Sequence, residues 1–392
     1  MFALPRAARK AFASITAGVA ALTLAACEPV SMSGGSTGPS INTSAPVPVA
    51  LLVPRGSGSS GDDVLAQSLE NAARLAANDL DGVQIDLRVY NTAGNAATAQ
   101  SVASKAIDDG AKIILGPVYG ESANAVGIVA AQRGVNVLAF SNNPTVAGGN
   151  VFILGPTFQN TANRLARYAK DQGKQNIVVV ASTNLAGQLG QQAIQSAAQT
   201  AGVNVASSVT YEFSQQGVMS AVPRVKSAVD QGADAIFLTA DTSGALPLFS
   251  QLLPEQGVSP AATQFIGLTR WDIPPQTLEL PGVQGGWFAM PDPNLSQQFS
   301  SRYAAAYGGQ PHPIGSLAYD GIAAIGALVK QGRGDALTGQ ALTQSAGFQG
   351  VGGVFRLLGN GTNERGLAVA TVRDGQVVVI DAAPRAFGGF GF

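Results

Sequence analysis

Residues 109–117 read DGAKIILGP. They contain a short apolar strand, 112–115, between two segments whose apolar residues recur at helical spacing, 96–107 and 122–133. A continuous apolar run of this length is typical of a strand that is buried on both faces, as strands of parallel sheets are. The stretch therefore predicts a parallel sheet that helices cover on both sides.

The same alternation of strand and helix extends in both directions from this stretch. It forms one series up to residues 152–154 and then restarts, which predicts two successive parallel sheets with helices on both faces. The expected strands are 49–53, 85–90, 112–115, 136–140 and 152–154, then 177–180, 203–209 and 235–238, and the expected helices are 64–75, 96–107, 122–133, 160–171, 188–201 and 218–230.

Beyond Phe265 the order of elements changes. The pattern predicts a strand, two long helices and then strands that end in a hairpin around Asp374-Gly375, a dipeptide that suits a tight turn. The chain first forms one sheet and then a second, and its later strands and helices are divided between the two. It must therefore cross between two lobes several times. The predicted fold class is therefore α/β, with two doubly wound parallel-sheet lobes, a multi-crossover hinge and a ligand cleft at the carboxyl ends of the strands. These later elements are expected at 286–290, 297–307, 314–330, 354–358, 367–372 and 377–380.

The composition excludes several classes of protein. Of the 392 residues, 46% are hydrophobic and 12% are charged, which argues against a disordered chain. A net charge of -1 argues against a nucleic-acid partner, because such partners need a basic surface. One His and one Cys cannot assemble a four-ligand zinc site or an iron–sulfur cluster. We therefore expect no metal and no cofactor.

The N-terminus has the pattern of a secretory signal. Three basic residues, Arg6, Arg9 and Lys10, precede an uncharged run over residues 11–26. The run ends in LAAC at residues 24–27, which resembles the lipoprotein box of bacteria. In that box the cysteine is acylated and becomes the first residue after cleavage.

This resemblance implies a signal peptide over residues 1–26 and lipid attachment at Cys27. It places the protein in the periplasm, anchored to a bacterial membrane. Glu28 after the anchor, where an inner-membrane lipoprotein typically has Asp, slightly favours the outer membrane. Residues 27–46, rich in Ser, Gly, Thr and Pro, predict a flexible tether. The alternative is a soluble secreted protein with an incidental cysteine.

Several stretches of the remaining chain resemble the type I periplasmic binding protein family, in particular its leucine/isoleucine/valine-binding branch. They are VALLVP at 49–54, DGAKIILGP at 109–117, and FQGVGGVF at 348–355 followed by DGQV at 374–377. The likeness covers about residues 47–380. It implies a non-enzymatic protein that captures an amino acid or another small polar solute between its lobes and presents it to an ABC permease.

The first strand, YNT at 90–92 and the stretch 109–117 are also similar to the related domain of penicillin-binding protein activators. Those proteins are outer-membrane lipoproteins that stimulate peptidoglycan synthases. This resemblance implies an alternative function: regulation of peptidoglycan synthesis through the same fold, with a peptidoglycan synthase as the partner and an unused cleft or one that holds a cell-wall fragment.

The fold also implies a division of the chain. We expect one leucine-binding-protein-like domain over residues 47–383. Lobe one is expected over about 47–158 and 286–353, and lobe two over about 159–285 and 354–383. A Gly/Phe tail follows at 384–392, which is either frayed or a docking peptide for a partner.

In the amino-acid-binding relatives, two loops of lobe one hold the carboxylate of the substrate through a hydroxyl group and backbone amides at a helix N-terminus. Ser122, Ser141, Asn142 and Asn143 match those positions in this chain. The unpaired N–H groups and partial positive charge of a helix N-terminus suit a small polar or anionic group. The alternative is that Ser122 and Asn143 only cap their helices.

Lobe two departs from the family pattern. The relatives have an aromatic residue after the first strand of this lobe, where this chain has residues 182–187 with Ala186 nearest that position. They also have an acidic residue for the ammonium group of the ligand, where this chain has Thr269. Because burial of an ammonium group without a carboxylate is costly, an ordinary α-amino acid is a less favoured ligand.

Other side chains of lobe two are candidates to replace the missing groups. Asn184 lies in the first of these stretches, and Asp241 could supply a carboxylate from a neighbouring loop. Trp271 and Arg270 could stack on and pair with a sugar or peptide ligand. The alternative for Trp271 is a packing position at the hinge or in the core.

No enzyme motif is complete in the sequence. GSGSSG at 56–61 matches the glycine pattern of dinucleotide-binding folds, but Pro54 interrupts the turn that this motif needs. The second strand ends in Tyr90-Asn91 without the acidic residue that binds ribose. The single histidine, His312, lies between two prolines, and no serine-hydrolase elbow occurs. We therefore expect no enzymatic activity.

Overall fold

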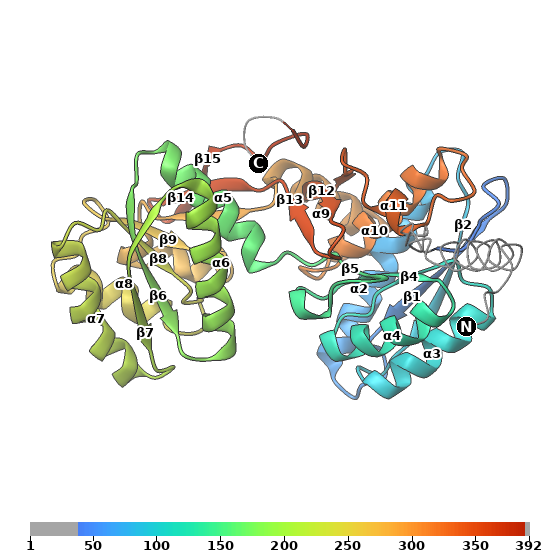
Figure 1. Cartoon of the computed structure of the whole chain (residues 1–392), viewed down its shortest axis with the longest axis horizontal. Helices are drawn as coiled ribbons and strands as arrows, with labels where there is room; N and C mark the ends of the chain where they lie inside the picture. The colour runs from blue at the N-terminus through green and yellow to red at the C-terminus, as the bar shows by residue number, and fades with distance from the viewer. Residues whose placement is uncertain (1–37, 389–392) are drawn as a thin grey trace, which may run out of the picture.

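Five short strands, of which all but the edge strand β2 are buried, form the sheet of lobe one in the computed structural model, which describes residues 38–388 (Figure 1). All neighbouring strands are parallel, in the order β2-β1-β3-β4-β5. Helices α3 and α4 cover one face of this sheet, and α2 covers the other. The bounds are β1 (Val47–Val53), α2 (Ser60–Asp79), β2 (Ile85–Asn91), α3 (Ala96–Asp108), β3 (Ile113–Leu115), α4 (Gly120–Gln132), β4 (Asn136–Ala139) and β5 (Val151–Ile153).

Lobe two contains a seven-stranded sheet in the order β15-β14-β10-β9-β8-β6-β7. Strands β6 to β10 are parallel, and the hairpin β14–β15 extends the sheet in antiparallel fashion. Helices α5 and α6 cover one face, and α7 and α8 cover the other. The bounds are α5 (Phe158–Asp171), β6 (Asn176–Ser182), α6 (Leu185–Ala201), β7 (Asn204–Tyr211), α7 (Gln215–Asp230), β8 (Ala235–Leu238), α8 (Leu246–Glu255), β9 (Gln264–Gly267), β10 (Trp287–Met290), β14 (Ala368–Arg373) and β15 (Gln376–Asp381).

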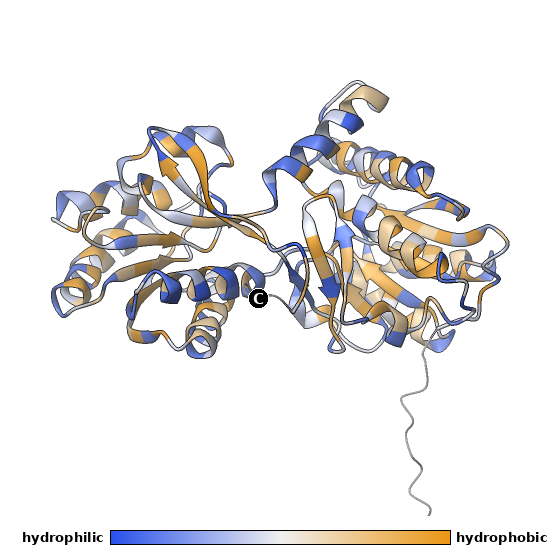
Figure 2. Ribbon diagram, turned by 90° about the horizontal axis from the view of Figure 1, so that it is seen from above, coloured by the Kyte–Doolittle hydropathy of each residue, from blue (hydrophilic) through white to orange (hydrophobic). Residues whose placement is uncertain are grey.

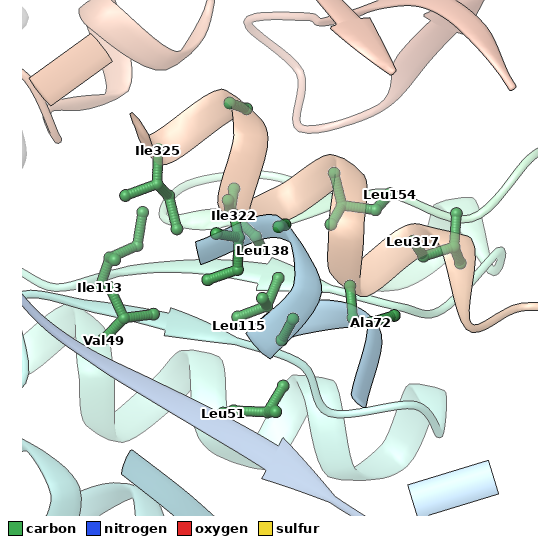
Figure 3. Packing of buried hydrophobic residues seen from close by; sticks show 14 of the residues in the cluster. Val49, Leu51, Ala72, Ile113, Leu115, Leu138, Leu154, Leu317, Ile322 and Ile325 are labelled. Carbon is green, nitrogen blue, oxygen red and sulfur yellow. The ribbon is translucent and has the colours of Figure 1, made fainter. Parts of the chain in front are cut away.

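The later part of the chain completes lobe one. Helices α9 (Pro293–Tyr307) and α10 (Ser316–Val329) pack with α2, and a small sheet of β11 (Phe348–Gly350), β12 (Gly353–Leu357) and β13 (Asn363–Arg365) packs beside them. In the core of this lobe, side chains from the sheet point toward side chains of α10 (Figure 3). In both lobes the central strands are mostly hydrophobic (Figure 2), because both faces of each sheet are covered.

Between β5 and β14 the chain crosses between the lobes at three places. They are Pro156-Thr157 between β5 and α5, Pro291-Asp292 between β10 and α9, and Gly366-Leu367 between β13 and β14. Figure 1 shows lobe two at the left, lobe one at the right and these connections between them. The predicted fold class, two doubly wound lobes with a multi-crossover hinge, is confirmed.

The predicted boundaries of the lobes are wrong at two places. Strand β10 was expected to begin the second part of lobe one, but it pairs with β9 and β14 in the sheet of lobe two. Residues 354–365 were expected in lobe two, but β12 pairs with β11 and β13, and its Phe355 and Leu357 lie in the core of lobe one. An apolar strand pattern predicts burial but does not identify the sheet that buries the strand.

The expected tether is shorter than predicted. Residues 38–46 lie against lobe one, where the Ile41 side chain is buried and its backbone N–H donates to the carbonyl oxygen of Gly334 over 2.9 Å. Gly38 fits closely against the backbone of Thr338. The predicted signal peptide, Cys27 and the first residues of the tether lie outside the described residues.

The beginning of the Gly/Phe tail is packed, so a tail that frays from residue 384 is wrong. After β15 of lobe two, the chain returns to lobe one, where the Phe387 ring lies 4.6 Å from the guanidinium carbon of Arg356 and against Gly347. A cation over an aromatic face is attracted by the ring quadrupole. The tail thus adds a further link between the lobes, and residues 389–392 lie outside the described residues.

Gly116, in the stretch 109–117, provides a test of the backbone path of lobe one. Its φ is +93°, and an added Cβ would lie 2.3 Å from the carbonyl oxygen of Leu52. Gly110 has a similar φ of +99° but open space around it. We expect Gly116→Ala to lower the free energy of unfolding by about 2–4 kcal/mol, and Gly110→Ala by only about 1–2 kcal/mol, in urea titrations. Equal losses for the two variants would contradict this path of the chain.

Candidate ligand-binding site

The carboxyl edge of the sheet in lobe one carries a hollow of about 590 Å³. It lies where the loops after β1, β2 and β3 enter helices α2, α3 and α4. We call it the lobe-one hollow. Its lining residues are Ser57, Asp62, Ala93, Gly94, Asn95, Ala96, Tyr119, Gly120, Glu121 and Ser122.

A tyrosine and a carboxylate stand together in the lobe-one hollow. The Tyr119 hydroxyl donates a hydrogen bond to Oδ1 of Asp62, and this bond raises the pKa of Tyr119 to about 12. The ring of Tyr119 stays 40% exposed. Oδ2 of Asp62 points toward Gly94, where an added Cβ would lie 3.3 Å from it. The hollow therefore offers an aromatic face beside a carboxylate that can accept further hydrogen bonds.

Acidic and amide side chains already occupy the three helix N-termini around this hollow. Asp62 and Asp63 lie in the first turn of α2, and Glu121 lies in the first turn of α4. Asn95 caps α3 by accepting hydrogen bonds from the backbone N–H groups of Ala97 and Thr98. Negative side chains at these positions balance the partial positive charge of the helix ends.

The structure places the four predicted residues of lobe one in the first turn of α4 and on the loop after β4. Ser122 is 1% exposed and lines the hollow, at the third residue of α4 rather than at its cap. Oγ of Ser141 accepts a hydrogen bond from the backbone N–H of Asn143, and Asn142 is exposed. Asn143 caps the short 3-10 helix η2 (Pro144–Val146) and lies beside Gly120. Capping therefore explains Asn143 but not Ser122.

In lobe two, three predicted residues follow the carboxyl ends of neighbouring strands. Asn184, after β6, caps α6 and accepts hydrogen bonds from the Ser182 hydroxyl and the Gly187 N–H, both at 2.8 Å. Asp241, after β8, is exposed. Thr269, after β9, donates from its hydroxyl to the carbonyl oxygen of Ala240 over 3.4 Å. We call this region the lobe-two edge.

The prediction that Trp271 contacts ligand is wrong in this structure. Its side chain is 0% exposed, and it fills a slot between Gly267 and Gly286 beside the Phe288 ring. An added Cβ at either glycine would lie 2.3 Å from the indole ring. Trp271 is therefore a core residue, and the neighbouring Arg270 is paired with Asp272.

Sequence reasoning missed a set of exposed apolar side chains on the lobe-two edge. Leu185, Phe213 and Ile273 are 71%, 59% and 47% exposed and follow β6, β7 and β9. Phe213 and Asp241 both lie against Gly244, so the ring and the carboxylate are neighbours. The available signal was a large apolar residue soon after the end of a strand, where a polar turn residue is usual.

A second cavity, of about 500 Å³, lies at the hinge and has walls from both lobes. All three crossovers contribute to it, through Pro156, Pro291 and Gly366. Arg270 and Ile273 line it from lobe two, and α9 and α10 line it from lobe one. Of the candidate residues from the sequence, Arg270 lines this hinge pocket, and the predicted residues of the lobe-one loops and the lobe-two edge do not.

A buried ion pair forms part of the hinge pocket. Asp320 is 1% exposed, and its Oδ2 lies 3.1 Å from Nη1 of Arg365, while its Oδ1 accepts the N–H of Val351 over 2.8 Å. Burial raises the pKa of Asp320, and the Arg365 guanidinium and the Val351 N–H oppose this effect. Arg365 also donates to the carbonyl oxygen of Leu154. The pair thus ties α10 to β13 and to the end of β5.

Two negative findings hold for residues 38–388. In this part of the chain no group of His, Cys, Asp and Glu side chains could hold a metal ion. No helix there is long and apolar enough to cross a membrane.

Solved structures share this fold. An ABC transporter substrate-binding protein from Desulfitobacterium hafniense in complex with Leu has 19% identity and a TM-score of 0.63, over 86% of this chain and 100% of that one. A solute-binding protein from Rhodopseudomonas palustris in complex with 3,4-dihydroxy benzoic acid has 18% identity and a TM-score of 0.58, over 86% and 98%. A branched-chain amino acid ABC transporter periplasmic ligand-binding protein from Burkholderia xenovorans has 18% identity and a TM-score of 0.66, over 88% and 97%.

Sequence comparison identifies the family directly. No curated protein matches the chain significantly. The family model described as periplasmic binding protein matches residues 46–376, which include both lobes and all three crossovers. The chain belongs to the periplasmic binding protein family.

Proposed function

We propose that this protein is the solute-binding component of an ABC transporter and captures a small ligand between its two lobes. The observation that carries the proposal is that polar and aromatic side chains stay exposed at the carboxyl edges of both sheets. In open parallel sheets this edge is where ligands bind. Closure about the three crossovers would bring the lobe-one hollow and the lobe-two edge onto one ligand.

The solved structures with a similar fold support a small ligand. One is described in complex with leucine and another in complex with 3,4-dihydroxy benzoic acid. In this chain the ligand would contact Ser122 and the loop with Ser141, Asn142 and Asn143 from lobe one. It would contact Asn184, Asp241 and Thr269 from lobe two. Such a protein binds and releases its ligand unchanged, so we expect no catalysis.

The proposed place of action is the periplasm, where an ABC permease would receive the ligand. We further propose that lipid at Cys27 attaches the protein to a membrane, with Glu28 favouring the outer one. The described residues begin at residue 38, so the anchor rests on the lipoprotein box alone.

A second candidate is the regulation of a peptidoglycan synthase through the same fold. Two observations favour it: Trp271 is enclosed in the core, and lobe two has Ala186 and Thr269 where the resemblance to amino-acid-binding proteins implies an aromatic and an acidic residue. A regulator could do without these contacts, because its partner would recognise an outer surface of a lobe.

Thermal unfolding with a panel of amino acids, amides, amines, aromatic acids and cell-wall peptides separates the two functions. A ligand present at about 100 times its Kd stabilises the folded state by about 2.7 kcal/mol, so we expect at least one compound to raise Tm by several degrees. Asn142→Trp places a large side chain on the exposed rim of the site and should remove the shift without lowering the Tm of the free protein. If no compound raises Tm and the protein co-purifies with a transpeptidase, the transport function is wrong.

A further inference from the structure

The charge of the lobe-one hollow restricts the ligand that it can accept. Its lining residues include two carboxylates, Asp62 and Glu121, and no Lys or Arg. The nearby Arg55 is engaged elsewhere, because its guanidinium donates to Glu70 over 3.1 Å and to Gln67 over 3.2 Å. A ligand carboxylate in this hollow would therefore meet like charge without a basic partner. Like-charge contacts at an interface are unfavourable and select against the wrong ligand.

A serine hydroxyl in the same hollow has no hydrogen-bond partner among residues 38–388. Ser122 is 1% exposed and lines the hollow, and no hydrogen bond among the described residues involves its hydroxyl group. A hydroxyl oxygen can accept a hydrogen bond from an N–H donor. A ligand that supplies a donor would therefore make a hydrogen bond to Ser122 that the described residues do not make.

An aromatic ring lies beside a carboxylate on both lobes. In lobe one, the exposed ring of Tyr119 adjoins Asp62. On the lobe-two edge, Phe213 and Asp241 lie against the same glycine, Gly244. A ring face attracts a cation, and a carboxylate pairs with it, while Leu185 and Ile273 add exposed apolar surface for the rest of a ligand.

We propose that the ligand is an amine with an apolar or aromatic body and without a carboxylate. Its ammonium group would bind Oδ2 of Asp62 and the Ser122 hydroxyl, over the ring of Tyr119. Its body would lie against Phe213 and the neighbouring apolar side chains of lobe two. This inference rests on the proposed function as a solute-binding protein and names the class of solute.

Matched compounds test the proposal on the full chain by isothermal titration calorimetry. Phenethylamine, phenylalanine and 3-phenylpropionate share one ring and differ in the ammonium and carboxylate groups. 3-Methylbutylamine, leucine and 4-methylpentanoate form the same series with an aliphatic body. We expect the amine of at least one series to bind, the amino acid of that series to bind about tenfold more weakly or worse, and the acid not to bind.

Two variants locate the site. Asp62→Asn should weaken amine binding by about tenfold or more, because it removes the negative charge and keeps the size of the side chain. Asp63→Asn is the matched control on the same helical turn. Asp63 accepts the N–H of Gly56 and does not line the hollow, so its replacement should change affinity by less than about twofold.

Tighter binding of leucine, phenylalanine or either acid than of the amines would overturn the proposal and leave solute binding intact. Equal losses of amine affinity in Asp62→Asn and Asp63→Asn would also overturn the amine proposal. If none of the six compounds binds, the amine proposal fails, and the wider thermal panel decides whether the solute-binding function fails with it.

Discussion

Trp271→Ala will lower the free energy of unfolding by about 3–5 kcal/mol, the range for loss of a large buried aromatic side chain. The indole is fully buried and fills the slot that Gly267 and Gly286 leave open beside Phe288. The surrounding strands belong to one sheet and cannot collapse easily into the space, so a cavity remains. Urea unfolding followed by circular dichroism measures the loss.

Phe213→Ala is the control. Because Phe213 is 59% exposed, its replacement should lower the free energy of unfolding by less than about 0.5 kcal/mol. A similarly small loss for Trp271→Ala would show that the indole is exposed in solution. The prediction that Trp271 contacts ligand would then deserve a new test.

Asp320→Ala will lower the free energy of unfolding by about 3–5 kcal/mol, because it leaves a buried guanidinium without its carboxylate. The side chains of Asp320 and Arg365 are only 2% and 9% exposed. The N–H of Val351 also loses its acceptor. Chemical unfolding of Asp320→Ala, Arg365→Ala and the double variant measures the coupling between the two groups, and we expect the double variant to lose less than the sum of the single losses.

Asp335→Ala is the control for a surface pair, because the side chains of Asp335 and Arg333 are 48% and 63% exposed. Its loss should stay below about 1 kcal/mol. Equal losses of unfolding free energy in Asp320→Ala and Asp335→Ala would show that the Asp320–Arg365 pair is open to solvent. The pair would then not stabilise the link between α10 and the crossovers.

The sequence predicted the parallel series of both lobes because their signals are local. Apolar runs such as β3 and β8 mark strands that are buried on both faces, and the helical spacing between them marks the covering helices. The short strand β9 and the helix α8 were missed, because Pro254 and the long loop that follows β9 weaken the periodic pattern. The assignment of β10 and β12 to a lobe depends on which distant strands they pair with. A local sequence pattern carries no information about that pairing.

The candidate site shows the same limit. Sequence position placed Ser122, Asn184, Asp241 and Thr269 at the ends of strands, because those loops follow directly from the alternation. The burial of Trp271 depends on Gly267 and Gly286, which are far apart in the sequence but lie in β9 and directly before the neighbouring strand β10. The neighbouring positions of Tyr119 and Asp62, and of Phe213 and Asp241, arise from loops that meet only in three dimensions.

The central claim is that a solute binds between the lobes and closes them. Spin labels are attached at Ile128→Cys on α4 and Met219→Cys on α7, in a chain with Cys27→Ser. Double electron–electron resonance then measures the distance between the two labels, and so between the lobes. Both native residues are exposed, at 54% and 49%, so the labels should leave the fold intact. With a saturating concentration of any compound that raises Tm, the account predicts a shift of the distance distribution to shorter values. An unchanged distribution at saturation would contradict it.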